Sequence, residues 1–513
     1  MNKREIATES GIPQAGELST SVWAALRSPR RLRTEVLSGL VVALALIPEA
    51  ISFSIIAGVD PRVGLFASFT MAVTIAFVGG RPAMISAATG AVALVIAPLV
   101  RDHGMDYFIA AVILAGVLQI ALSLFGVARL MRFIPRSVMV GFVNALAVLI
   151  FMSQLPHLLG VPGLVYPFVA AGLLIMVLLP KVTAAVPAPL VAIVVLTVVA
   201  VIFGVDVPTV GDQGELPSSL PGLFIPDVPL TLGTLSIIAP YALAMALVGL
   251  LESLMTAKLV DDITDTHSDK TREGWGQGVA NVVTGFFGGM GGCAMIGQTM
   301  INVKVSGART RISTFLAGVF LITLVVGLGD VVGLIPMAAL VAVMIMVSVA
   351  TVDWHSIAPA TLRRMPKSET LVMMATVLVT VASHNLAAGV IVGSLTAMVL
   401  FARRVSHMVT VEKIEEYDED GDGTVDHVVY RVSGELFFAS SNDLVYQFDY
   451  AGDPDFVVID LSESHIWDAS TVAALDAVAT KYHAKGKYAD IVGLNQDSAD
   501  RHGRLSGQFG AQH

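Results

Sequence analysis

The stretch that decides the fold is FFGGMGGCAMIGQT, Phe286–Thr299, in which four glycines occupy five consecutive positions. The segment that follows the glycines is too short to cross a bilayer by itself, since a membrane-spanning helix needs about 20 apolar residues. Around this break, the 513 residues are 55% hydrophobic and 14% charged, whereas soluble proteins carry about 25% charged residues. The chain is therefore a membrane protein, and its glycine-rich break lies inside an apolar region.

Acidic and basic residues are unevenly distributed along the chain. From Val409 onward there are 20 acidic and 7 basic residues, which leaves 21 acidic and 24 basic residues before that point. We expect a cytosolic leader (residues 1–34), a transmembrane domain (35–404) and an acidic soluble domain (409–513). The leader is polar for too long to be a cleaved signal peptide, and an interfacial helix is expected around Val22 to Leu26. A single cysteine, Cys293, excludes a disulfide within the chain, and no cluster has the spacing of zinc ligands.

Apolar runs between glycine, proline and charged residues predict the membrane-spanning segments. The distribution of Lys and Arg tests these predicted segments, because both residues concentrate in cytoplasmic loops. They fall almost entirely on the side of the basic leader, and the predicted external side receives only Arg62 and Arg101. Both termini are therefore expected in the cytosol. Fourteen segments are predicted: 35–57, 62–79, 84–100, 106–126, 135–155, 164–180, 187–204, 235–256, 275–288, 293–303, 312–328, 334–351, 369–383 and 386–402.

The fourteen segments divide into two sevens, about 35–204 and 235–402, which enter the membrane in opposite directions because seven is odd. ALALIPEAISF (Ala43–Phe53) and ALVGLLESLM (Ala246–Met255) each place a glutamate six residues after an Ala-Leu pair. AMIS (Ala83–Ser86) and AMIG (Ala294–Gly297) recur at the third segment of each half. These matches predict an inverted repeat.

Each third segment follows sequence that breaks a helix, GGRPAM in the first half and GGMGGCAM in the second. Non-helical backbone at membrane depth persists only beside protein or a wet cavity. We therefore expect two half-helices that start near the midplane from opposite faces. Their free N–H groups and partial positive charges would form an anion site. The alternative is that the glycines only allow close helix packing.

Glu49 and Glu252 lie inside apolar segments, where an ionised side chain costs at least about 2.5 kcal/mol and indicates a function. Carboxylates beside an anion site repel the substrate unless a proton or a metal cation neutralises them. We expect Glu252 to be the coupling residue, either protonated or as part of a Na⁺ site with Thr256, which lies one helical turn further on. The alternative for each glutamate is a hydrogen-bonded role in helix packing.

Beyond Arg404 the hydrophobic pattern predicts a small α/β domain. VVYRVSGELFF, FVVIDLS and YADIVGL are expected strands, and SNDLVYQFDYA and STVAALDAVATKYHAKG are expected helices. The acidic run YDEDGDGTVD matches an EF-hand loop at Asp418, Asp420, Asp422 and Gly423, but Val429 stands where a bidentate glutamate is required. A hairpin turn without calcium is therefore expected there.

Three motifs carry a resemblance to a known family. ALIPEAISFSIIAGVDPRVGLFAS, GLLES and GQGVANVVTGFFGGMGG resemble the SulP (SLC26) family of anion transporters, and the tail resembles a STAS domain. The resemblance implies fourteen spans in two inverted repeats, with a core domain that moves against a gate domain in an elevator-type cycle. It also implies a homodimer and a substrate among sulfate, bicarbonate, chloride and dicarboxylates. Nucleobase permeases share this architecture.

The resemblance also implies site residues. It places a Na⁺ site of bicarbonate transporters on Glu252, Thr256 and Ala294–Ile296, and Glu49 is a further candidate for binding the coupling ion. Ser470, in WDASTVAAL, matches a position that is phosphorylated in bacterial anti-anti-sigma relatives, with a helix N-cap as the alternative. The implied substrate-binding residues are Phe53, Ser86, Ala87, Ala88, Thr89, Ala294, Met295, Ile296 and Gly297.

These observations favour a secondary transporter of bicarbonate or sulfate, coupled to Na⁺ or H⁺, in a bacterial cytoplasmic membrane. No other cofactor and no nucleic-acid partner are expected, whereas a regulatory partner at the STAS domain is. An enzyme is not expected, because the chain has no paired-histidine metal motif, no Ser-His or Ser-Lys constellation within the spans and no nucleotide-binding loop. Two alternatives stay open: a carrier of dicarboxylate, chloride or a nucleobase with the same fold, and a membrane-tethered STAS signalling protein.

Overall fold

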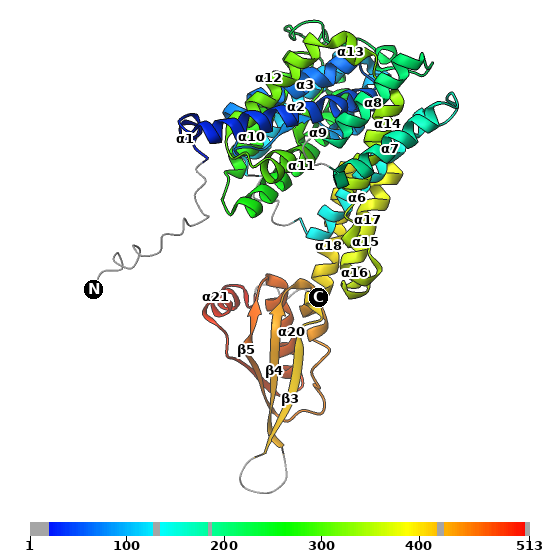
Figure 1. The fold of residues 1–513 in the computed structure, drawn as a ribbon. Helices are drawn as coiled ribbons and strands as arrows, with labels where there is room; N and C mark the ends of the chain where they lie inside the picture. The colour runs from blue at the N-terminus through cyan, green and yellow to red at the C-terminus, as the bar shows by residue number, and fades with distance from the viewer. Residues whose placement is uncertain (1–19, 127–133, 183–186, 418–424, 508–513) are drawn as a thin grey trace, which may run out of the picture. The chain divides into compact units, whose positions relative to one another are not determined.

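The computed structural model describes residues 20–126, 134–182, 187–417 and 425–507. The chain forms two compact units, Met1–Ser394 and Leu395–His513. Figure 1 shows that the first unit is helical and that α2, α3 and α12 pack together in it. Its elements are α1 (Val22–Leu26), α2 (Pro29–Ala57), α3 (Pro61–Val78), β1 (Ser86–Ala88), α4 (Gly90–Leu124), α6 (Arg136–Met152), η2 (Leu155–His157), α7 (Val165–Val182), α8 (Ala188–Phe203), η3 (Val210–Gln213), α9 (Leu232–Thr264), α10 (Lys270–Phe286), β2 (Gly292–Ala294), α11 (Ile296–Met300), η4 (Ile301–Val305), α12 (Arg311–Gly327), α13 (Gly329–Gly333), α14 (Met337–Thr351), α15 (Trp354–Ile357), α16 (Pro359–Arg364), α17 (Lys367–Ser383) and α18 (Leu386–Ser406), the last of which continues into the second unit.

Long apolar helices dominate the first unit. Among the described residues, seven helices are long and apolar enough to cross a membrane: α2, α3, α4, α6 extended to His157, α7, α9 and α18. The helices α8, α12 and α14 are apolar but shorter. Every expected segment contains helical residues, so helical structure along these segments is confirmed. The count of fourteen complete spans stays a prediction.

The expected segments 84–100 and 106–126 are joined in α4. Gly104 interrupts this helix with φ 83° and ψ −174°, a conformation that glycine adopts without steric cost. The expected helix around Val22 to Leu26 is present as α1, whose N-cap Ser21 accepts a hydrogen bond from the Ala24 N–H. The element α9 is longer than expected and continues to Thr264.

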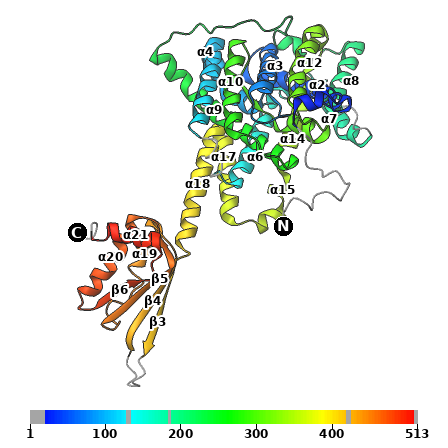
Figure 2. The ribbon, with the colours of Figure 1, turned by 90° about the vertical axis from the view of Figure 1, so that its left-hand side faces the viewer.

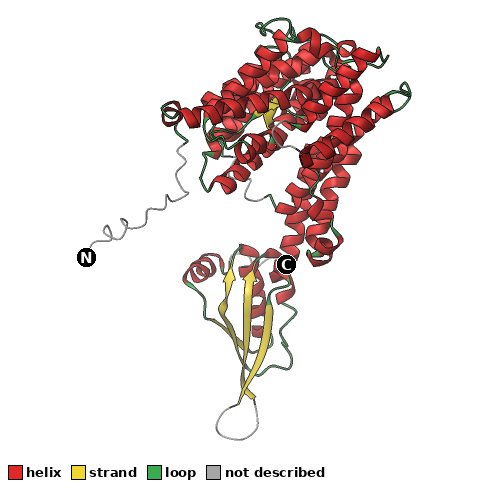
Figure 3. Cartoon of the chain, in the orientation of Figure 1, coloured by secondary structure: helices red, strands yellow, loops and turns green. Residues whose placement is uncertain are grey.

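The two broken segments meet in a short sheet. Strand β1 pairs antiparallel with β2, with Ser86 opposite Ala294, Ala87 opposite Cys293 and Ala88 opposite Gly292. Figure 3 shows this pair surrounded by the helices of the first unit. The predicted helix starts near residues 84 and 293 are therefore wrong by several residues, since α4 begins at Gly90 and α11 at Ile296. The reason is physical: two adjacent extended segments satisfy each other's N–H and C=O groups where water is absent.

Glycines allow two close backbone approaches in this region. A Cβ atom on Gly292 would lie 2.1 Å from the carbonyl oxygen of Ala87, so only glycine lets β2 approach β1. A Cβ atom on Gly116 would lie 2.6 Å from the Gly278 carbonyl oxygen, and the reverse distance is also 2.6 Å. Helices α4 and α10 therefore cross with their backbones in contact. The glycines thus serve close packing as well as the helix break.

The second unit is a four-stranded sheet with three helices, which Figure 2 shows beside the strands. The strands β3 (Thr410–Tyr417), β4 (Val425–Leu436), β5 (Phe456–Ile466) and β6 (Tyr488–Val492) follow one another in space. The first pair is antiparallel, and the other two pairs are parallel. The helices are α19 (Phe438–Leu444), α20 (Ala469–His483) and α21 (Gln496–Leu505).

The three expected strands and the helix after residue 470 are confirmed, whereas the helix expected over 441–451 is shifted to α19. Strand β3 and helix α21 were not predicted. The residues of the EF-hand match, Asp418, Asp420, Asp422 and Gly423, lie outside the described residues, as does the hairpin turn expected there. Val429 lies in β4.

The N-cap alternative for Ser470 is wrong. Asp468 caps α20, because its Oδ1 accepts hydrogen bonds from the Thr471 N–H at 3.0 Å and from the Thr471 hydroxyl at 3.1 Å. Ser470 is exposed in the first turn of the helix. A carboxylate is the stronger partner for the N–H groups and positive end of a helix, which explains why it takes the cap position.

Candidate functional site

Both helix starts open onto one cavity of about 100 Å³. Helices α2 and α9 each contribute a glutamate, and α6 and α14 form the remaining wall with mostly apolar side chains. The cavity therefore combines the two features that the sequence pointed to, interrupted helices and intramembrane carboxylates. Its described lining residues, none of which is Lys or Arg, are Glu49, Phe53, Thr89, Gly90, Ala91, Phe142, Val143, Leu146, Ile150, Glu252, Met295, Ile296, Gly297, Val347 and Thr351.

The predicted substrate-binding residues fall into two groups. Phe53, Thr89, Met295, Ile296 and Gly297 line the cavity. The others lie in the paired strands, are buried and do not line it: Ser86, Ala87, Ala88 and Ala294. The strands thus support the helix starts from behind, and the first group contains the stronger candidates for contact with a substrate.

Each helix start leaves backbone donors free at the cavity, because the first N–H groups of a helix have no acceptor within it. At the start of α4, the Thr89 hydroxyl oxygen accepts a hydrogen bond from the Val92 N–H at 3.4 Å. At the start of α11, Met295 provides no side-chain cap. Helical structure continues from Ile296 to Val305, with π geometry after Met300. The partial positive charge at these starts favours an anion in the cavity.

Glu252 has an unexpected partner. Its Oε2 accepts a hydrogen bond from the Cys293 thiol, with 2.9 Å between oxygen and sulfur. The same sulfur lies 3.2 Å from the Thr89 hydroxyl oxygen. The sequence analysis did not single out Cys293 as a site residue, although the only cysteine of the chain stands inside the motif that breaks the helix.

The Thr256 hydroxyl is hydrogen-bonded to backbone carbonyls and, among the described contacts, not to the Glu252 carboxylate. It donates to the Glu252 backbone carbonyl at 2.8 Å and lies 3.5 Å from the Ala294 carbonyl oxygen. Two of the oxygens expected for a Na⁺ site, the Thr256 hydroxyl and the Ala294 carbonyl, therefore lie near each other, whereas the Glu252 carboxylate is hydrogen-bonded to the Cys293 thiol. Hard cations prefer such oxygen ligands. Among the described residues, no group of three or more His, Cys, Asp and Glu side chains has the arrangement of a metal site.

Glu49 connects α2 to α11. Its Oε1 accepts a hydrogen bond from Gln298 Nε2 at 2.9 Å, while the buried Oε1 of Gln298 has no partner in the described part of the chain. The two glutamates therefore share one cavity but differ in their partners, an amide for Glu49 and a thiol for Glu252.

One face of α10 holds β1 and the segment that leads into it. Glu273 accepts hydrogen bonds from the N–H groups of Gly80 and Arg81 at 2.7 and 2.9 Å, just before β1. One turn further, Gln277 Nε2 donates to Glu273 at 2.8 Å and to the Ser86 hydroxyl at 2.6 Å. The Ser86 side chain thus faces α10 and not the cavity. Polar residues four positions apart in GQGVANVV were the available signal for this face.

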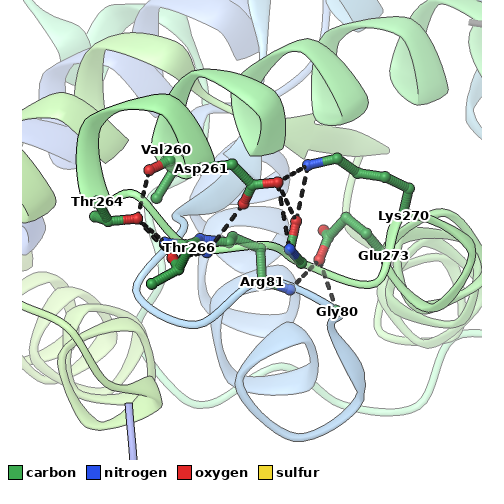
Figure 4. Close-up of polar contacts among 9 residues, drawn as sticks. Gly80, Arg81, Val260, Asp261, Thr264, Thr266, Lys270 and Glu273 are labelled. Carbon is green, nitrogen blue, oxygen red and sulfur yellow. Dashed lines mark hydrogen bonds and ion pairs between the residues drawn. The ribbon is translucent and has the colours of Figure 1, made fainter. Parts of the chain in front are cut away.

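A partly buried ion-pair cluster lies next to this face, and Figure 4 shows Asp261 between Arg81 and Lys270. Arg81 Nη1 donates to Asp261 Oδ1 at 2.9 Å, and Lys270 Nζ donates to Asp261 Oδ2 at 2.5 Å. The Arg81 guanidinium also donates to the Thr266 and Thr264 hydroxyls at 2.7 and 2.5 Å. Because Arg81 directly follows Gly80, this cluster fixes the chain that leads into β1.

Comparisons with known proteins agree with this architecture. A model of the sulfate permease family matches residues 32–170 and 164–376, and a STAS domain model matches residues 420–505. YbaR of Bacillus subtilis, whose name assigns it to sulfate transport, is 54% identical over 91% of this chain and 95% of its own length. The bicarbonate transporter BicA of Picosynechococcus is 25% identical over 91% of this chain and 90% of its own length.

Solved structures share the fold. The overall structure of SLC26A9 has a TM-score of 0.76 at 16% identity and covers 94% of this chain and 88% of that one. The transmembrane domain of a cyanobacterial BicA has a TM-score of 0.61 at 24% identity and covers 70% of this chain and 98% of that one. Paired half-helices, the α/β tail and the matches over most of the chain thus lead to one assignment: the chain belongs to the sulfate permease family, with a C-terminal STAS domain.

Proposed function

We propose that this protein is a secondary transporter that carries sulfate or bicarbonate across a bacterial cytoplasmic membrane, with both termini in the cytosol. The observation that supports this most directly is the cavity in which two helix starts, at Gly90 and Ile296, meet with no Lys or Arg among the described lining residues. Backbone N–H groups can bind a small anion there and release it, because no Lys or Arg holds it permanently. The names of YbaR and BicA support sulfate and bicarbonate as the candidate anions.

Transport is coupled to a cation in this proposal. An anion in the cavity lies near the carboxylates of Glu49 and Glu252, and like charges repel strongly where water is scarce. Uptake of H⁺ or Na⁺ at Glu252 removes that repulsion, so that the anion and the cation bind together. The buried Glu252 carboxylate, which has a thiol partner and no basic partner in the described part of the chain, is suited to this role.

Alternating access of the elevator type is supported by the packing of two helix groups. Helices α2, α3, α4, α9, α10 and α12 pack mainly with one another, as do α6, α7, α8, α14 and α17. The cavity lies between them, with both glutamates and the start of α4 on the first group, the start of α11 packed against α2 and α9 of that group, and mostly apolar residues of α6 and α14 on the second. Movement of the first group past the second would carry the anion site across the membrane. We also propose that the chain works as a homodimer.

Uptake into proteoliposomes tests the proposal. Purified protein is reconstituted, and entry of radiolabelled sulfate or bicarbonate is measured with imposed pH and Na⁺ gradients and with unlabelled fumarate, chloride or uracil as competitors. We expect one inorganic anion to enter faster under one of the two gradients. Glu252→Gln should abolish the dependence on that gradient, whereas Glu412→Gln, at an exposed position in β3, should leave it unchanged. Failure to accumulate either anion under any gradient would disprove the proposal, and competition by uracil alone would favour a nucleobase carrier.

A further inference from the structure

One side chain joins the proposed coupling residue to the cap of the first half-helix. Cys293 Sγ lies 2.9 Å from Glu252 Oε2 and 3.2 Å from Thr89 Oγ1. The three residues come from three elements, β2, α9 and the start of α4, and their exposed fractions are 0% for Cys293, 7% for Glu252 and 2% for Thr89. Glu252 and Thr89 both line the cavity, whereas Cys293 lies behind it.

The chemistry of the three groups sets the direction of their hydrogen bonds. An ionised carboxylate only accepts, so the Cys293 thiol must donate to Glu252. The sulfur can then only accept a hydrogen bond from Thr89. The Thr89 hydroxyl therefore directs its proton toward the sulfur and away from the cavity. The Thr89 oxygen in turn accepts from the Val92 N–H at the start of α4. A continuous chain of hydrogen bonds therefore runs from the helix start to the carboxylate.

We propose that Cys293 is a positioning residue that transmits anion binding at Thr89 to Glu252. An anion in the cavity is a stronger acceptor than sulfur and takes the Thr89 hydroxyl proton into a hydrogen bond of its own. Sulfur that no longer accepts this bond donates more weakly to Glu252, because hydrogen bonds in a chain strengthen one another. The carboxylate then loses part of its stabilisation and binds the coupling cation more tightly. By linkage, the cation raises the affinity for the anion by the same factor. This inference rests on the proposed function.

The surroundings of Glu252 leave Cys293 as the connection. The other carboxylate at the cavity, Glu49, has a separate partner in Gln298 and no hydrogen bond to Cys293 or Thr89 among the described residues. No described lining residue of the cavity is Lys or Arg. The Thr256 hydroxyl is engaged with backbone carbonyls. A change at Cys293 therefore alters the link from Thr89 to Glu252 without removing a group from either end.

The single cysteine makes the link directly observable. Because the chain contains one Cys, the S–H stretching band in the infrared spectrum of the full-length protein belongs to Cys293 alone. We expect addition of sulfate or bicarbonate to the purified wild type to shift this band toward that of a weaker donor. Thr89→Val should abolish the shift and weaken anion affinity about tenfold, as expected for one hydrogen bond to a charged group, whereas Thr89→Ser should retain both. A band that does not move when the anion binds would overturn the inference.

Variants at Cys293 test the transmission itself. The readout is the ratio of the anion dissociation constants measured without and with the coupling cation, expected to be about fivefold or more in the wild type. Cys293→Ala should bring this ratio close to one while anion binding persists, and Cys293→Ser should restore it, since a hydroxyl both donates and accepts. Ser123→Ala, which removes a buried hydroxyl that has no partner among the described residues, is the control.

The two proposals fail in different ways. If the wild type transports an anion and Cys293→Ala keeps the wild-type ratio, the inference is wrong and the proposed function stands. If the wild type binds and transports no anion, the proposed function itself is wrong. Should Cys293→Ala not fold, the response of the S–H band in the wild type decides the question.

Discussion

Asn281 pairs with Gly292 through both groups of its side-chain amide. Its Oδ1 accepts the Gly292 N–H at 2.8 Å, and its Nδ2 donates to the Gly292 carbonyl at 3.0 Å. The side chain thus takes the place of a neighbouring strand at the free edge of β2, where the backbone is buried. Gln119 completes the arrangement, because its Oε1 accepts the second Nδ2 hydrogen of Asn281 at 2.8 Å.

Asn281→Leu is expected to destabilise the protein by about 2–4 kcal/mol, because a buried N–H and a buried C=O each lose their partner at about 1–3 kcal/mol. The thermal midpoint of the detergent-solubilised protein measures this loss. Ser123→Ala, which leaves no group unpaired, should stay close to the wild type. Equal midpoints for the two variants would show that Asn281 does not support β2.

Gly292→Ala is expected to impair transport through the geometry of the two strands. The added Cβ would lie 2.1 Å from the Ala87 carbonyl oxygen, so that β1 and β2 must separate. Overpacking of this kind costs about 1–3 kcal/mol, and the helix starts at the cavity should be displaced with the strands. We expect the KM for the anion to rise together with a lower thermal midpoint. Gly327→Ala, at a position where a Cβ meets no atom within 4 Å, is the matched control; a Gly292→Ala protein with the same KM would contradict the prediction.

Arg81→Lys is expected to behave as a disruptive substitution. The planar guanidinium donates to Asp261, Thr264 and Thr266 at once, and a lysine ammonium does not reproduce that fork. Arg81→Leu should be worse, by about 1–3 kcal/mol relative to the wild type, because it removes the donors to Asp261, Thr264 and Thr266 while only Lys270 still pairs with Asp261. Limited proteolysis and the thermal midpoint should rank the proteins as wild type, Arg81→Lys and Arg81→Leu. The exposed pair of Arg101 and Asp102 provides the comparison, since Arg101→Leu should change neither measurement.

The second unit should lose stability in acid through Asp460. The hydroxyl and N–H of Ser462 stabilise the ionised carboxylate and lower the pKa of Asp460 below its usual value. A lowered folded-state pKa contributes stability above the unfolded-state pKa of about 4, and this contribution disappears as the pH falls through the folded-state value. Urea unfolding of the full chain, followed by hydrogen exchange in β5, measures the free energy of unfolding of the second unit. Between neutral and acidic pH, this free energy should fall less in Asp460→Asn than in the wild type. Parallel pH profiles for both proteins would refute this assignment.

The sequence predicted most of the features that build the cavity. Glycine and proline marked the helix breaks before Gly90 and Ile296, and charge inside apolar segments marked Glu49 and Glu252. These predictions succeeded because they rest on local properties, helix disruption and the cost of a buried charge, that a single stretch of sequence displays. Whether these residues bind substrate or cation stays a prediction.

What the sequence could not show depends on contacts between distant residues. Strands of three residues such as β1 carry no periodic pattern, and the partner of Ala87 is Cys293, far along the chain. The hydrogen bond from the Cys293 thiol to the Glu252 carboxylate depends on the same pairing of β1 with β2. In the second unit, Asp468 and Ser470 both suit a helix N-cap, and the choice depends on where the backbone leaves β5.

The crossing of Gly116 and Gly278 has a consequence for the transport cycle. The backbones of α4 and α10 touch there without intervening side chains, so neither helix can slide along the other without a steric clash. Helix α4 begins at one end of the proposed anion site, and α10 leads into the other. In the elevator-type cycle that we propose, α4 and α10 would therefore move together as one rigid unit, and the relative movement would take place at the interface with α6 and α14.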